Sequence, residues 1–244
     1  MATHTLLTPK IWLDGFALNP RIFSTAQDYS CAEIDDTAFG TTGTRSTAAG
    51  MLTHRYVDQA YHSAGSGTDV DDVLFSRVGT GAIVRTVAPL TGAEGEAAYT
   101  TRILQARYNP FDGGSVGEMH ATSFEGQNDG TPLVRGTVLN FATENTTGAG
   151  TAFQVGAISA TQIGYAALHI TDPVSLTDID VKIESDSAEN FGASPEDQIT
   201  FTQQTGAGSD WQTVAGAVTD DWWRINVTGL TGTSAIVVVV FGIL

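Results

Sequence analysis

Three aspartates stand close together in residues 68–78 and offer the carboxylate oxygens that Ca²⁺ prefers. They are Asp69, Asp71 and Asp72. A dedicated calcium loop spaces its donors along a glycine-kinked turn, whereas these residues lie where a helix is expected to begin. Acidic side chains at that point stabilise the positive end of the helix dipole. We therefore interpret the group as helix-stabilising and predict no metal site.

The histidines and the remaining acid pairs form no recognisable catalytic pattern. None of the histidines stands in a His-x-x-x-His motif or beside a nucleophilic serine, and they are His4, His54, His62, His120 and His169. A hydrolase of the two-carboxylate type needs two acids in one cleft. The pairs Asp178/Asp180 and Asp220/Asp221 are better explained as solvated surface groups. We predict no catalytic residues, no enzyme activity and no cofactor.

Three tryptophans late in the chain could stack on sugar rings. They are Trp211, Trp222 and Trp223. Adjacent residues on a strand point to opposite faces, so one of Trp222 and Trp223 should lie in the core and the other outward. Core packing is favoured for most of this cluster. A glycan-binding or adhesion module is kept as the alternative function.

The charge balance is strongly acidic and restricts the possible partners. The 244 residues contain 27 acidic and 11 basic side chains, a formal net charge of −16, and the only lysines are Lys10 and Lys182. Binding around DNA needs many lysines and arginines, so the composition argues against it. An acidic wall would instead let a polyanion pass without sticking. Solubility, or life in high salt, would also explain the acidity.

Cysteine usage and hydrophobic runs exclude further classes. Cys31 is the only cysteine, so an intrachain disulfide and a cysteine zinc site are excluded. Residues 1–8 do not resemble a secretory signal. The apolar run at residues 236–244 is far shorter than the roughly 20 residues of a membrane helix. We expect it to form a buried strand and expect no membrane insertion.

The first half should be a β-sandwich or barrel with one short helix. Asp14-Gly15 between apolar runs predicts a hairpin, and residues 68–78 predict the helix, capped by Thr68 or Asp69. Residues 35–50 form a long loop of small side chains. Strands are expected at residues 22–33, 51–58, 82–88, 97–108, 117–126 and 133–141.

The second half should be a separate β-sandwich, of jelly-roll or immunoglobulin-like type. Strands are expected at residues 152–158, 164–170, 178–184, 199–205, 211–214, 222–228 and 235–243. Val181 and Ile183 alternate with Lys182 and Glu184, which predicts a half-buried strand. Residues 143–151, rich in Thr, Asn and Gly, are typical of a linker. The sequence thus predicts an all-β chain with domains at residues 1–145 and 146–244.

Several short segments occur in an order that carries a family resemblance. In the first half they are the loop entrance Ile34-Asp35-Asp36-Thr37-Ala38-Phe39-Gly40 with Arg45 beyond it, the strand 53–57, the turn 64–67, the helix 69–78, the segment 114–119 and the strand 133–139. The second half adds Val181-Lys182-Ile183-Glu184-Ser185 and Trp222-Trp223-Arg224. Together they resemble the tail tube protein of long-tailed bacterial and archaeal viruses, with the accessory domain that some of these proteins carry.

The resemblance implies a structural protein of the virion tail, made in the host cytoplasm. Subunits of that family form hexameric rings that stack into a tube, contact other tail proteins and let DNA pass without specific binding. The resemblance assigns the contact with the neighbouring ring to the loop that contains Asp35, Asp36, Phe39, Gly40 and Arg45. The second domain would face outward, where Trp211, Trp222 and Trp223 could contact other molecules.

Overall fold

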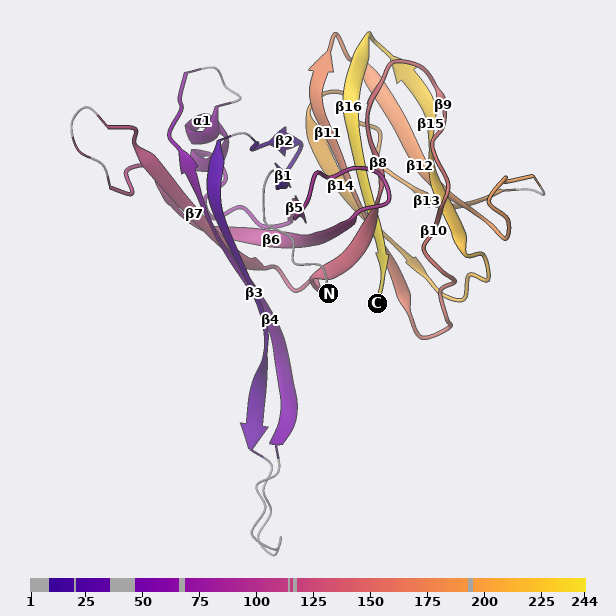
Figure 1. Cartoon of the computed structure of the whole chain (residues 1–244), viewed down its shortest axis with the longest axis horizontal. Coiled ribbons are helices and arrows are strands. Elements are labelled where there is room, and N and C mark those ends of the chain that lie inside the picture. Colours follow the sequence, from indigo (N-terminus) through magenta and orange to yellow (C-terminus); the bar gives the residue numbers. More distant parts are fainter. Residues whose placement is uncertain are drawn as a thin grey trace, which may run out of the picture. The chain divides into compact units, whose positions relative to one another are not determined.

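The computed structural model describes residues 9–19, 21–35, 47–65, 69–113, 115, 118–192 and 195–244. Most of these residues lie in antiparallel strands, and one short helix interrupts them (Figure 1), so the all-β prediction is confirmed. The elements are β1 Lys10–Leu13, β2 Phe16–Ala17, β3 Ile22–Asp35, β4 Thr47–Tyr61, α1 Val70–Phe75, β5 Ile83–Ala88, β6 Ala97–Asn109, β7 Ala121–Asn128, β8 Val134–Glu144, β9 Gly148–Ala149, β10 Phe153–Gln154, β11 Ile163–Val174, β12 Asp178–Asp186, β13 Glu196–Thr200, β14 Gly208–Ala215, β15 Trp222–Thr231 and β16 Ser234–Ile243.

The chain divides into two compact units, which we describe separately. The first unit contains residues 1–20, 83–102 and 134–244, and the second contains residues 21–82 and 103–133. Each unit is therefore built from segments that are far apart in the sequence. The division predicted at residue 145 falls inside the first unit.

The first unit is a sandwich of two sheets. One sheet has the strand order β14-β11-β16-β8-β6-β5-β1-β2, with β6 contributing its first residues, and the other has the order β10-β15-β12-β13, with β9 also paired to β15. Between them lies a core of aliphatic and aromatic side chains from both sheets, among them Leu168, Ile183, Trp223 and Phe241. Burial of this shared apolar surface holds the two sheets together.

The valine run near the end of the chain is the central strand β16. Val237 and Val239 face the core between the two sheets, whereas Val238 and Val240 face a second buried cluster that contains Trp12. A strand buried on both faces has no polar alternation, which explains why its sequence is uniformly apolar. The prediction of a buried strand here is confirmed.

The segment predicted to be a linker connects the two sheets of the sandwich. Glu144, at the end of β8, pairs with Ala235 of β16 in one sheet. A few residues later, Gly148 and Ala149 form β9 and pair with β15 in the other sheet. The Thr, Asn and Gly residues do form a connection, but both ends of it enter the same core. The linker interpretation is therefore corrected to a crossing between sheets.

The predicted Asp14-Gly15 hairpin is present and reaches the far side of its own sheet. Both residues have positive φ, of 49° and 80°, and join β1 to β2. The side chain of Ser209 on β14 donates a hydrogen bond to Asp14 at 2.8 Å, and the Gly15 N–H donates to Nδ1 of His169 on β11 at 3.4 Å. These contacts join the two margins of the sheet, so the sheet curls around the cluster that contains Trp12.

The second unit is built on β3, β4, β7 and the last residues of β6, which pair in that order. The helix α1 covers residues 70–75, shorter than the predicted 68–78. Asp69 occupies the N-cap position without a side-chain cap, because its carboxylate pairs with Arg21 instead. The side chain of Gln105 donates to the Leu74 carbonyl at 2.7 Å, and this bond holds the helix against β6.

Glu184 corrects the prediction of a strand with one polar face. Val181 and Ile183 point into the core as expected, but Glu184 is also buried. Its carboxylate accepts hydrogen bonds from Arg224 and Asn226 on β15 and lies 2.8 Å from Nζ of Lys182. Burial raises the pKa of Glu184, but the bonds from these partners outweigh burial and leave the pKa below its ordinary value.

Candidate assembly surface

The longest feature of the second unit is the hairpin of β3 and β4, which runs beyond the strand that supports it. β4 pairs with β7 only from Arg55 to Tyr61, whereas β3 and β4 pair with each other up to Asp35 and Thr47. Figure 1 shows these two strands continuing together as a two-stranded ribbon. We call residues 30–35 and 47–53 the arm.

The arm has two open margins among the residues that the structure describes. β3 pairs with β4 alone along its whole length, and within the arm β4 pairs with β3 alone. Each open margin presents backbone N–H and C=O groups that another strand could pair with. The arm is therefore a ready template for adding strands from another chain.

Apolar side chains are exposed on the arm, where the register between β3 and β4 shifts between Cys31 and Glu33. Ile34 on β3 and Met51 and Leu52 on β4 are all exposed, and Met51 has 78% of its surface accessible. Met51 and Leu52 are consecutive, so they point to opposite faces of the ribbon. Neither face of the arm is thus covered within the unit. Such a two-sided apolar ribbon is a predicted contact surface.

The described part of the arm carries only acidic charge. Its ionised side chains are Glu33 and Asp35, both exposed at the far end of β3. Cys31, the only cysteine, is exposed here too, and its thiol lies 3.4 Å from the carbonyl oxygen of Gly50 on β4. The arm combines open backbone, exposed apolar groups and negative charge.

The base of the arm is rigidly packed. Tyr56 is buried against Phe124, and Asp58 is buried and accepts a hydrogen bond from Thr25 at 2.6 Å. A Cβ atom at Gly126 would lie 2.3 Å from the Tyr56 ring, so β7 needs a glycine at this position. Arg55 pairs with Glu125 at 2.6 Å where the support by β7 begins. A firmly held base gives the arm a defined direction.

Only part of the predicted contact loop can be placed. Asp35 is the exposed last residue of β3. Asp36, Phe39, Gly40 and Arg45 lie outside the described residues. Residues 47–50, predicted as the end of this loop, belong to β4.

The structure adds exposed apolar residues that the sequence did not reveal. The sequences around Ile34, Met51 and Leu52 are typical of strands, so nothing in the local pattern distinguishes these residues from core residues. The one available signal was the pair of consecutive apolar residues, Met51-Leu52, at the start of a predicted strand. Such a pair cannot place both side chains on one face of a sheet.

The three tryptophans do not form one aromatic platform. Trp223 is fully buried and donates from its indole nitrogen to the Gly156 carbonyl at 2.8 Å. Trp222 precedes Trp223 on the same strand and is half-buried, as expected for a residue that points to the opposite face. Trp211 lies on the other sheet, half-buried, with its ring 5.9 Å from that of Tyr165. Only Trp211 is thus paired with a second accessible aromatic ring.

The three aspartates near α1 bind separate partners. Asp69 pairs with Arg21, Asp71 accepts a bond from the Tyr108 hydroxyl at 2.6 Å, and Asp72 accepts one from the Gly65 N–H. Burial first, and Asp71 next, raise the pKa of Tyr108 above its ordinary value. In the described residues no group of three His, Cys, Asp or Glu side chains is arranged to hold a metal ion. None of the helices in that part of the chain could span a membrane.

Comparison with known proteins finds only distant structural likeness. No protein-family model and no curated protein matches the chain. The Dit protein of phage SPP1, described as a paradigm of the hub adsorption apparatus in phages that infect Gram-positive bacteria, is 11% identical and matches over 97% of this chain and 99% of its own, with a TM-score of 0.37. A baseplate structure of the anti-feeding prophage matches over 55% of this chain and 97% of its own, at 13% identity and a TM-score of 0.37.

A third match is the baseplate of phage p2 in its activated conformation, with 8% identity over 96% of this chain and 97% of the other and a TM-score of 0.30. These neighbours are phage hub and baseplate proteins. None of those named is described as a tail tube protein. At such TM-scores the likeness does not identify what the chain does, so the assembly surface has to be judged by its own geometry.

Proposed function

We propose that the chain is a structural subunit of a viral tail, which assembles through the arm into hexameric rings that stack as a tube. The observation that carries this proposal is the hairpin β3–β4, whose margins are open and whose Met51 and Leu52 are exposed. Strand addition at an open margin supplies main-chain hydrogen bonds, and burial of the apolar side chains supplies the driving force. A heterologous contact of this kind closes into rings when its rotation permits.

The acidic composition suits a conduit for DNA. The net charge of −16 gives the assembled wall a negative potential that repels phosphate and prevents trapping. In this proposal the subunit resides in the virion tail, contacts other tail proteins and lets the genome pass during ejection. Neither a cofactor nor an enzymatic step is needed for that role.

A second candidate function, glycan binding, is favoured by one observation. Trp211 and Tyr165 form an accessible aromatic pair on β14 and β11, with their ring centroids 5.9 Å apart. Aromatic faces of this kind can stack on sugar rings. This function needs no rings, so imaging the purified protein discriminates it from the first.

The experiment compares two methionine variants by electron microscopy and sedimentation velocity. Met51→Lys places a charge on the arm, and Met119→Lys places the same charge at an exposed methionine elsewhere in the second unit. We expect wild type and Met119→Lys to form rings or tubes, and Met51→Lys to associate at least about tenfold more weakly, the effect of losing about 1.4 kcal/mol of apolar burial.

Cys31 supplies an independent readout of the same contact. Since it is the only cysteine and is exposed on the arm, a maleimide probe reports on the arm alone. The thiol should be protected in assembled wild-type protein and reactive in Met51→Lys. A wild-type protein that stays monomeric at high concentration with a fully reactive Cys31 would refute the proposal.

A further inference from the structure

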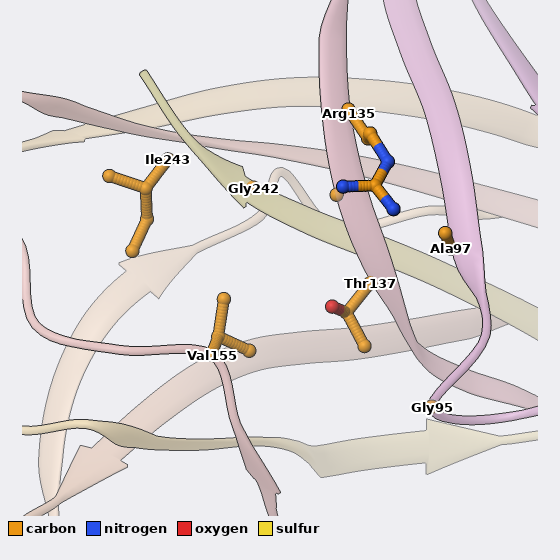
Figure 2. Close-up of a pocket in the computed structure, with 8 residues that line it drawn as sticks. Gly95, Ala97, Arg135, Thr137, Val155, Gly242 and Ile243 are labelled. Atoms are coloured by element: carbon orange, nitrogen blue, oxygen red, sulfur yellow. The ribbon is translucent and has the colours of Figure 1, made fainter. Parts of the chain in front are cut away.

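A pocket of about 350 Å³ opens at one end of the sandwich in the first unit. Its walls come from β6, β8 and β16 of one sheet and from Val155, next to β10 of the other sheet. Val155 and Ile243, which pack at the edge of the sandwich core, form its apolar side (Figure 2). Its size is near the lower end of the range of ligand pockets in proteins.

Glycines let two strands that line this pocket lie close together. A Cβ atom at Gly136 would lie 2.5 Å from the carbonyl oxygen of Phe241, and one at Gly242 would lie 2.8 Å from that of Arg135. The strands β8 and β16 therefore approach so closely that neither position accepts a side chain. This part of the pocket wall is consequently backbone and carries no side chain.

Arg135 is the only charged residue in the pocket lining. Figure 2 shows its guanidinium extending along β8 toward Thr137 and Ala97. Arg135 and Thr137 are two residues apart on one strand and so share a face. Arg135 is exposed and forms neither a hydrogen bond nor an ion pair with the residues described here, whereas the carboxylate of Glu96 is held by Thr91 and Ala93 in its own turn. The guanidinium is therefore accessible to a ligand from solution.

We propose that this pocket binds a carboxylate group, with Arg135 as the anchor and the Thr137 hydroxyl as a second donor. A guanidinium presents two parallel N–H groups that match a carboxylate. Phosphates carry more negative charge, and the field of a chain with net charge −16 repels them more strongly than it repels a single carboxylate. The pocket can accommodate a free acid the size of a sugar acid or the acidic side chain of another copy of the chain.

Saturation-transfer difference NMR with sodium glucuronate tests the free-acid source, and it works for a monomer or a large assembly. Methyl glucoside is the neutral counterpart, and inorganic phosphate is the competing anion. We expect binding of glucuronate with a Kd of about 1 mM, little signal from methyl glucoside, and weaker competition from phosphate than from acetate. Arg135→Gln should weaken glucuronate binding at least about tenfold, the loss expected for charge-assisted hydrogen bonds.

Two further variants and a second measurement complete the test. Arg107→Gln removes the same charge at an exposed site in the second unit and should leave glucuronate binding unchanged. Arg135→Lys should retain only part of the glucuronate binding that Arg135→Gln loses. If the carboxylate belongs to another copy, Arg135→Gln should instead lower the sedimentation coefficient of the assembly while Arg107→Gln does not. The proposal is overturned if Arg135→Gln changes neither glucuronate binding nor sedimentation relative to Arg107→Gln.

Discussion

The buried His169 should make the stability of the first unit fall in acid, and one substitution should remove this effect. His169 has no exposed surface. Its Nδ1 accepts the Gly15 N–H, so the proton of the neutral ring is on Nε2 and points to Oγ1 of Thr86 at 2.8 Å. Burial lowers the pKa of His169 from 6.5 to about 3, and the nearby Asp14 opposes that shift only weakly.

The sign and size of the effect follow from proton linkage. Because the pKa is lower in the folded state, the unfolded chain binds the additional proton between about pH 6.5 and pH 3. Stability is therefore lost as the pH falls through that window. Between pH 7 and pH 5 the equilibrium constant for unfolding rises by about 1.4 powers of ten, which lowers the free energy of unfolding by about 2 kcal/mol.

The assay is urea unfolding of wild type and His169→Asn at pH 7 and pH 5, followed by tryptophan fluorescence. Trp12 lies next to His169, with ring centroids 6.5 Å apart, and reports on this region. The wild type should be the more stable protein at pH 7, and its advantage should shrink by about 2 kcal/mol at pH 5. His120→Asn, at an exposed histidine, is the matched control. An advantage that stays equal at both pH values would refute the reasoning.

Two further predictions concern the first unit, and both are measured by urea unfolding at pH 7. Trp223→Ala should cost about 3–5 kcal/mol because the ring is fully buried against Phe241, whereas Trp222→Ala, at the half-buried neighbour, should cost less than half as much. Gly15→Ala should cost more than about 1 kcal/mol, because φ is positive and the new Cβ would lie 2.2 Å from the Gly208 nitrogen. Gly156→Ala, also at positive φ but in open space, should cost less.

Much of the strand content could be predicted from local pattern. The Asp14-Gly15 turn and the valine run of β16 each have a physical signature that the rest of the chain does not override. Three predicted strands were displaced or shortened: residues 199–205 became β13 at Glu196–Thr200, residues 117–126 became β7 at Ala121–Asn128, and residues 152–158 kept only β10. Strand ends depend on which partner is adjacent, and local sequence does not specify the partner.

The pairing of distant segments could not be predicted. A Thr- and Gly-rich connection has the same kind of sequence whether it joins two domains or two sheets of one sandwich. The prediction of an interdomain linker at residues 143–151 therefore differs from the structure, in which this segment joins two sheets. Glu184 looks like a surface residue until Arg224 and Asn226, forty residues later, are placed beside it. On the arm, Met51 and Leu52 have the composition of a core strand, and only the end of β7 at Asn128 leaves them uncovered.

One sheet of the first unit and the long hairpin of the second unit differ in how their margins are bonded. In the first unit the Asp14-Gly15 turn bonds to His169 and Ser209 and closes the sheet. In the second unit the described residues of β3 leave one margin open for 14 residues; it holds no lysine or proline, but it carries the exposed acids Asp28, Glu33 and Asp35 and two register shifts. A protein selected to stay monomeric protects such a margin, because an open strand promotes association. A long open margin with a rigid base and exposed apolar groups is therefore what the proposed assembly through a partner strand requires.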